Sequence, residues 1–186
     1  MTELVAIAQD LQSFCEQHNW KFCIIGGLAL QFWGEQRLTK DVDITLLTGF
    51  GDEEIYIDAL LTKFEKRIDD AKRFALQKRV LLLQSCNRVG IDISLGAFPF
   101  EEKMTGRAVY KEYLPNISLK ICTAEDLIVL KAFAARDKDW VDISTVLIKQ
   151  DELDWNYIYE QLTPLVEIKY EPEILTRLQN LRKKYE

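Results

Sequence analysis

The sequence predicts an α+β fold, a small mixed β-sheet with helices packed on it, followed by a C-terminal helical subdomain. Up to about residue 122, short apolar runs of strand length alternate with helical patterns, whereas all later periodic segments have helical spacing. A chain of 186 residues is long enough for a compact domain and a small helical one. We therefore expect a core over residues 1–122 and a helical subdomain over residues 123–186.

Apolar side chains recur at helical spacing in residues 3–17 and 53–68, which predicts two amphipathic helices. The run Phe22–Ile25 is too short for a helix and ends at glycine, which favours a buried strand. A short helix is expected from Leu28, and a second strand ends at Leu47. The rest of the sheet is expected as a hairpin and two further short strands, at residues 77–85, 89–95, 108–114 and 117–121.

The part of the chain after residue 122 predicts helices only. Thr123, followed by Glu125 and Asp126, is typical of a helix N-cap with acidic residues in the first turn. The apolar periodicity then predicts four helices, over residues 123–135, 139–149, 154–165 and 171–185.

Composition and charge exclude several classes of protein. The net charge of −6 argues against a surface built for broad, non-specific nucleic-acid binding, although it leaves room for a local basic groove. No apolar run reaches membrane-spanning length, and the N-terminus lacks an apolar signal core, so we expect a cytoplasmic protein with no membrane partner. The four cysteines are widely spaced, which predicts buried free thiols and not a zinc site.

The candidate site lies within residues 22–47. Gly26 and Gly27 let the chain reverse and bring backbone N–H groups close to a ligand. The helix that follows offers unpaired donors and a partial positive charge at its N-terminus, which suits a phosphate group. Asp41 and Asp43 lie two residues apart on a strand and therefore share one face. Such a carboxylate pair is stable mainly when it holds a divalent cation or faces water.

A Gly-Gly turn followed, a dozen or so residues later, by Asp41 and Asp43 resembles the signature of the DNA-polymerase-beta-like nucleotidyltransferases. With Arg37 and Thr39, the pattern resembles the Arg-x-Thr-x-Asp-x-Asp form of AbiEii-like toxin nucleotidyltransferases and of small antibiotic-modifying adenylyltransferases. Many members of the superfamily have Gly-Ser in the turn. Here the second residue is Gly27, so a phosphate contact at this position must come from the backbone. The resemblance implies a nucleotidyltransferase core.

The resemblance also implies a third carboxylate on a neighbouring strand. Asp92, between Ile91 and Ile93, is the candidate, because an acid flanked by two isoleucines on a strand is otherwise hard to explain. It would hold the catalytic metal and accept the proton of the attacking hydroxyl group. Together with Asp41 and Asp43 it would bind two Mg²⁺ ions, with Mn²⁺ as an alternative. The competing interpretations are a plain strand–helix turn, a solvated strand end and an edge-strand aspartate facing water.

A second motif in the helical part, Lys131 with Arg136, Lys138, Asp139 and Asp142, resembles a segment of AbiEii-like proteins. A lysine inside an apolar helix is costly unless its ammonium group finds an anion. That anion is either a nucleotide phosphate, with Lys131 as a catalytic residue, or a buried Lys–Asp clamp joining two helices. Asp139 would orient Lys131 or touch the sugar or base. In this interpretation the helical subdomain packs against the active site.

Arg37 and Thr39 complete the set of candidate site residues. Arg37 either contacts the triphosphate or forms a salt bridge that fixes its loop, and Thr39 orients Asp41 through its hydroxyl group. The complete set of candidate nucleotide-binding residues is Gly26, Gly27, Arg37, Thr39, Lys131 and Asp139.

The resemblance implies an enzyme that transfers a nucleoside monophosphate from a nucleoside triphosphate, such as ATP or GTP, to a hydroxyl group. It further implies a tRNA end or a protein side chain as acceptor, and a cognate antitoxin as partner in a toxin–antitoxin pair. One alternative keeps this chemistry but uses an aminoglycoside or lincosamide antibiotic as acceptor. Another is a non-catalytic nucleotide-binding module.

Overall fold

The computed structural model describes residues 2–185, and its contacts divide the chain into two units. The first unit contains residues 1–28 and 38–122, and the second contains residues 29–37 and 123–186. The chain therefore leaves the first unit after Leu28, returns at Leu38 and leaves it again after Cys122.

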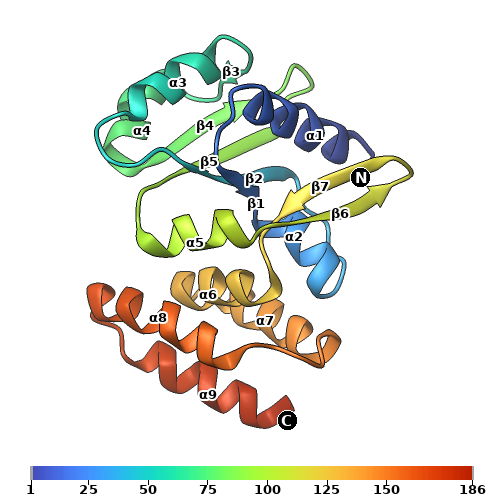
Figure 1. The fold of residues 1–186 in the computed structure, drawn as a ribbon, viewed down its shortest axis with the longest axis vertical. Helices are drawn as coiled ribbons and strands as arrows, with labels where there is room; N and C mark the ends of the chain where they lie inside the picture. The colour runs from blue at the N-terminus through green and yellow to red at the C-terminus, as the bar shows by residue number, and fades with distance from the viewer. Residues whose placement is uncertain (1, 186) are drawn as a thin grey trace. The chain divides into compact units, whose positions relative to one another are not determined.

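The first unit is built on a mixed sheet with seven strands among the described residues, in the order β3-β4-β5-β2-β1-β7-β6 (Figure 1). β2 is parallel to β5 and β1 is parallel to β7, while the other neighbours are antiparallel. The strands are β1 (Phe22–Ile24), β2 (Asp41–Leu47), β3 (Glu65–Lys66), β4 (Val80–Gln84), β5 (Gly90–Gly96), β6 (Val109–Leu114) and β7 (Ile117–Ile121).

Helices cover this sheet because each presents an apolar side to it. α1 contacts β7 and β2, α4 contacts β4, and α5 contacts β2 and β1. The alternating residues Val42 and Ile44 on β2, and Ile91 and Ile93 on β5, are fully buried and form the centre of the core. The helices are α1 (Thr2–Gln17), α2 (Gly26–Trp33), whose last residues belong to the second unit, α3 (Glu53–Leu61), α4 (Ala71–Lys78) and α5 (Pro99–Arg107).

The second unit is helical. α6 contacts α7, α8 and α9, and buried Ile128, Ile143 and Leu162 fill the space among these helices. The predicted cap of the first helix is confirmed, since the Thr123 hydroxyl group accepts a hydrogen bond from the backbone of Asp126 at 3.3 Å. The helices are α6 (Ala124–Ala134), α7 (Asp137–Lys149), α8 (Trp155–Lys169) and α9 (Glu173–Tyr185).

The predicted fold class is confirmed, but three elements differ from expectation. The helix predicted over residues 53–68 ends at Leu61, because Glu65 and Lys66 pair with β4 as an edge strand. Residues 77 and 78 close α4 and do not begin β4, since Arg79 adopts φ 56° and ends the helix. α5 was not predicted, although its start has a proline at the first position and a Glu101 side chain that accepts from the backbone of Phe98 at 2.9 Å.

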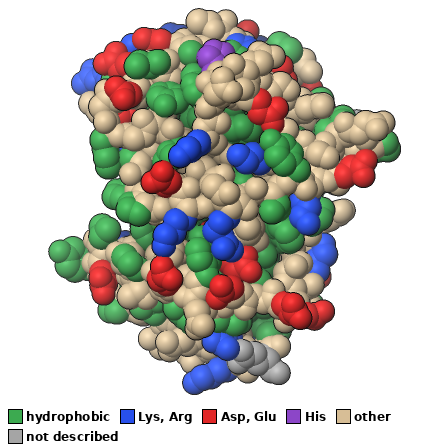
Figure 2. Space-filling model, viewed as in Figure 1, with side chains coloured by type: hydrophobic (Ala, Val, Ile, Leu, Met, Phe, Trp, Pro, Cys, Tyr) green, Lys and Arg blue, Asp and Glu red, His purple; other side chains and the backbone are tan. Residues whose placement is uncertain are grey.

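Surface features agree in part with the composition. Acidic and basic side chains are interspersed over the face drawn in Figure 2, without one dominant basic patch among the residues described there. Cys15, Cys23 and Cys122 are buried free thiols as expected, whereas Cys86 is exposed in the turn between β4 and β5. In the part of the chain that is described, no helix has the length and apolar character needed to cross a membrane.

Candidate functional site

The three candidate acids lie together on neighbouring parallel strands of the first unit. β2 and β5 pair in a register that sets Asp43 opposite Asp92 and Asp41 opposite Gly90. Residues paired in this way point to the same face, and Asp41 shares the face of Asp43 two residues away. The intervening Val42 and Ile91 are buried on the other face. The sheet therefore presents three carboxylates from two strands on one face.

Gly26 brings the end of β1 directly against this acid cluster. It has φ +61°, and a Cβ atom at this position would lie 2.7 Å from Cγ and 2.8 Å from Cβ of Asp43. The backbone of Ile25 also donates to the Asp43 carbonyl at 2.9 Å. Only glycine allows both the left-handed conformation and this close approach. The predicted glycine turn thus lies beside the predicted acids, although α2 already begins at Gly26 and not near Leu28.

Gly27 and Thr39 are packed against each other in the same region. A Cβ atom at Gly27 would lie 2.6 Å from Cβ of Thr39. The Thr39 hydroxyl group donates to the backbone carbonyl of Asp41 at 3.3 Å. Since the space above Gly27 is filled by Thr39, the serine found at this position in many nucleotidyltransferases would not fit here.

We expect Gly27→Ala to lower the free energy of unfolding by about 1–3 kcal/mol, because the added methyl group forces Thr39 and the start of β2 to shift. Thermal melting measures the loss, and the additional change Thr39→Gly should restore part of it. Gly106→Ala is the control, because a Cβ atom there meets nothing within 4 Å. Melting of Gly27→Ala at the temperature of this control would contradict the packing described.

Arg67 was not predicted as a site residue, and it joins two of the three acids. Its Nη2 atom donates to Oδ1 of Asp92 at 2.5 Å, and its Nη1 atom lies 3.8 Å from Oδ1 of Asp41. Gly90 leaves room for this contact, because a Cβ atom there would lie 2.5 Å from Nη1 of Arg67. Asp41 and Asp92 therefore converge on one point, where a cationic group of the protein lies between them.

Burial shapes the acidity of the third acid. The pKa of Asp92 is raised, chiefly because the half-buried carboxylate loses solvation, while the Arg67 guanidinium group opposes the shift and the Asp41 charge adds to it. Arg67 pairs with Asp92 and lies near Asp41. Carboxylate oxygens are the hard donors that Mg²⁺ and Mn²⁺ prefer. As they stand, however, no three acidic, histidine or cysteine side chains of the described chain are arranged to hold a metal ion.

The second candidate cluster lies entirely within the helical unit. Lys131 on α6 is 6% exposed, and its Nζ atom donates to Oδ2 of Asp142 at 2.6 Å and lies 3.6 Å from Oδ1 of Asp139. Arg136 donates to both oxygens of Asp139, at 2.6 and 3.2 Å. The anion that Lys131 requires is thus supplied by α7, as in the Lys–Asp clamp that the sequence left open.

Arg37 takes part in the same cluster. Its Nε and Nη2 atoms donate to the two oxygens of Asp142, at 3.0 and 3.1 Å. Burial alone would raise the pKa of Asp142, but the hydrogen bonds from Arg37 and Lys131 outweigh it and hold that pKa below its ordinary value. This is the salt bridge, one of the two roles considered for Arg37, and it ties the segment 29–37 to α7.

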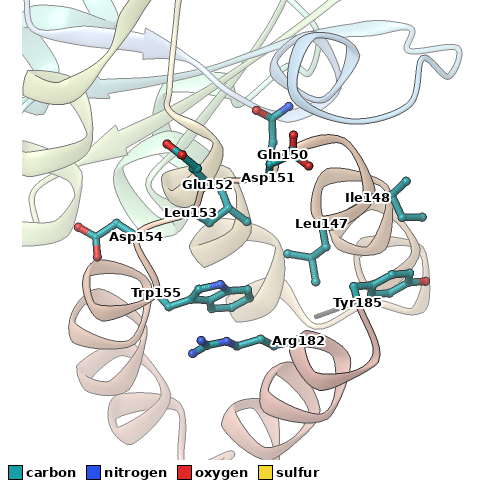
Figure 3. Close-up of a pocket in the computed structure, with 10 residues that line it drawn as sticks. All are labelled: Leu147, Ile148, Gln150, Asp151, Glu152, Leu153, Asp154, Trp155, Arg182 and Tyr185. Carbon is teal, nitrogen blue, oxygen red and sulfur yellow. The ribbon is translucent and has the colours of Figure 1, made fainter.

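A cavity of about 830 Å³ also lies in the helical unit, between the end of α7, the start of α8 and the end of α9 (Figure 3). The Arg182 guanidinium group lies 4.7 Å from the Trp155 ring centre on its wall. Asp151, Glu152 and Asp154 border the cavity as well. None of the residues predicted for the site lines it.

Comparison with known proteins agrees with the resemblance at the level of the superfamily. A family model described as "Nucleotidyltransferase of unknown function (DUF6036)" matches residues 2–186. No protein of curated function matches the sequence.

Solved structures give a likeness in fold. An antigenic nucleotidyltransferase-like protein from Paracoccidioides brasiliensis superposes with a TM-score of 0.54 at 15% identity, over 96% of this chain and 93% of that one. The antibiotic-resistance factor ANT(2'')-Ia gives 0.49 at 14% identity, over 99% and 94%. The lincosamide antibiotic adenylyltransferase LnuA, with lincomycin bound, gives 0.49 at 10% identity, over 73% and 91%. The fungal protein thus supports the fold described above.

Proposed function

The chain belongs to the family described as nucleotidyltransferases of unknown function, and on this premise we propose that it moves a nucleoside monophosphate from a nucleoside triphosphate to a hydroxyl group. One observation carries the proposal. Asp43 pairs in register with Asp92 on the adjacent parallel strand, Asp41 shares their face, and Gly26 lies against Asp43. Acids gathered in this way can hold the metal ions that phosphoryl transfer uses.

We propose that Asp41, Asp43 and Asp92 hold two Mg²⁺ ions, or Mn²⁺ in their place. The donor set fits in kind, because carboxylate oxygens are the ligands that these ions prefer. Bound ions would neutralise charge on the phosphate and clamp the attacking and leaving oxygens. Since Arg67 now lies between Asp41 and Asp92, metal binding requires its side chain to move.

The proposed reaction is an in-line displacement. The acceptor oxygen forms a bond to the α-phosphorus, the bond from this phosphorus to the bridging oxygen breaks, and pyrophosphate leaves with the electron pair. The acceptor proton passes to the Asp92 carboxylate, which acts as the general base. Backbone N–H groups at Gly26 and Gly27 are the proposed phosphate donors.

The roles of Arg37, Lys131 and Asp139 in nucleotide binding remain predictions. Within the helical unit Arg37 and Lys131 both pair with Asp142, and Lys131 also lies near Asp139. The Arg37 side chain is partly exposed, so it could also meet an anion such as a triphosphate. Loss of these residues is therefore expected to affect both stability and the Michaelis constant for the nucleotide.

The acceptor is proposed from the two motifs that resemble AbiEii-like proteins. These favour a tRNA end or a protein side chain, and with it a toxin held in check by a cognate antitoxin. An antibiotic acceptor keeps the same chemistry. A non-catalytic nucleotide-binding module is the second candidate, and one observation favours it: the described acids do not form a metal site while Arg67 pairs with two of them.

Incubation with each of the four α-labelled nucleoside triphosphates tests these proposals. We expect Mg²⁺-dependent release of pyrophosphate and transfer of label to RNA or protein. Parallel reactions contain total RNA, a protein extract, or a panel of aminoglycosides and lincosamides. Label found only in the antibiotics would exclude RNA and protein as acceptors. Nucleotide binding without pyrophosphate release under any condition would favour the non-catalytic module.

A further inference from the structure

Arg67 lies within the acid cluster, although the proposed reaction does not require a cationic side chain at this position. Its guanidinium group contacts Asp92 at 2.5 Å and lies 3.8 Å from Asp41. Those two oxygens are among the ligands proposed above for the metal ions. A group of this protein thus takes the place in which a divalent cation would neutralise them.

Strand register and the space left by Gly90 bring Arg67 to the acids. The backbone N–H of Arg67 donates to the Leu82 carbonyl at 3.0 Å, and Leu82 pairs with Asp92, which pairs with Asp43. Arg67 is therefore aligned with the row of residues that contains two of the acids. Gly90 completes the arrangement, because any side chain there would meet both Asp41 and the Arg67 guanidinium group.

The Arg67 side chain can move away from the two carboxylates. It is 31% exposed, and Arg67 follows β3, a two-residue strand at the edge of the sheet. Ion pairs that are open to solvent contribute little stability, typically about 0–1 kcal/mol. A doubly charged ion with several oxygen ligands therefore competes well for the same carboxylates.

We propose that Arg67 is a built-in counter-cation, which occupies the position between Asp41 and Asp92 until a divalent cation displaces it. This inference rests on the metal site of the proposed function. In the metal-free protein Arg67 relieves the repulsion between Asp41 and Asp92. Because two ligands that compete for one site lower each other's affinity by the same factor, removal of Arg67 tightens metal binding.

Manganese titration of the full chain without nucleotide tests the proposal, with the electron paramagnetic resonance signal of free Mn²⁺ as readout. We expect Arg67→Gln to lower the dissociation constant for Mn²⁺ by about fivefold, the largest gain that an ion pair of this strength allows. Lys66→Gln is the matched control: it removes the neighbouring exposed charge and should change binding less than about twofold. Asp41→Asn with Asp43→Asn should abolish binding in both the wild-type and the Arg67→Gln background.

Arg67→Lys keeps the charge but lacks the planar fork that spans two carboxylates, so its dissociation constant should fall between those of wild type and Arg67→Gln. It also serves as the informative variant if Arg67→Gln does not fold, since a value equal to wild type would then refute the counter-cation role. Equal affinities of wild type and Arg67→Gln, or equal tightening by Lys66→Gln, would overturn the inference and leave the metal site standing. Absence of Mn²⁺ binding in every variant would overturn the metal site and the inference together.

Discussion

Replacement of Asp41 and Asp43 by asparagine is expected to lower the rate of nucleotidyl transfer by about a thousandfold or more, since each factor of ten corresponds to ~1.4 kcal/mol and the metal supplies several. Asparagine keeps the shape of both side chains but removes the two negative charges that would attract the cation. Release of pyrophosphate from the preferred nucleotide measures the effect. If expression of the protein is toxic, the double variant should also relieve the toxicity.

Two controls make this result specific. Asp52→Asn removes an exposed carboxylate that makes no side-chain cap contact, and it should leave the rate unchanged. Thermal melting should show that the double variant still folds, because Asp41 is half exposed and both residues lie at one end of β2. Wild-type turnover by the double variant would remove the acid cluster from the mechanism and favour the non-catalytic module.

The second large effect is expected in the helical unit. Asp142→Asn should lower the free energy of unfolding at neutral pH by about 3 kcal/mol, because it leaves Lys131 buried without its closest anion. The same variant also removes the carboxylate that accepts two hydrogen bonds from Arg37. Denaturant unfolding measures the change. Asp137→Asn is the control, since Asp137 is fully exposed on the same helix and should cost less than about 0.5 kcal/mol.

The pH dependence of this effect has a definite sign. The pKa of Asp142 is lower in the folded protein than in the unfolded chain, so its charge stabilises the fold above the unfolded pKa, about 4. That contribution is lost as the pH falls through the lower, folded pKa. The difference in stability between wild type and Asp142→Asn should therefore shrink in acid. A difference that is constant from neutral pH to pH ~3 would contradict the charged pairing.

A double replacement separates the pairing from packing. Lys131→Met combined with Asp142→Leu should cost less than the sum of the two single changes, because no unpaired buried charge remains. If Lys131 also binds the nucleotide, as predicted, the double variant would be stable yet have a raised Michaelis constant. An unchanged constant would restrict Lys131 to the clamp.

Local patterns were sufficient to predict most elements that carry the site. Phe22–Ile25 and the strand ending at Leu47 were recognised from short apolar runs bounded by glycine and polar residues. The period of two placed Asp41 and Asp43 on one face. The alternation around Asp92 likewise identified β5 and its acid.

Arg67 could not be found in this way. The apolar spacing of residues 53–68 continues into Phe64, which is buried, so the pattern predicts a helix through the arginine. Pairing with β4 overrides that local preference. A strand of two residues is too short to show an alternating pattern in the sequence, so this pairing could not be predicted. Gly90 did carry a signal, because a glycine within a strand often marks the close approach of another group.

The partner of Lys131 was foreseen only as one of two alternatives. Its apolar surroundings required an anion, and the sequence offered both a nucleotide phosphate and the aspartates of the next helix. The spacing that sets Asp139 and Asp142 on one face of α7 made the second possible. The choice between them depended on how α6 and α7 pack, which the pattern of either helix alone does not specify.

Anomalous diffraction from crystals grown with Mn²⁺ and a non-hydrolysable nucleoside triphosphate would locate the metal ions. We expect manganese peaks bound by carboxylate oxygens of Asp41, Asp43 and Asp92, with the Arg67 side chain turned away from Asp92. Nucleotide bound with no manganese at these three residues, or with Arg67 still paired to Asp92, would contradict this expectation.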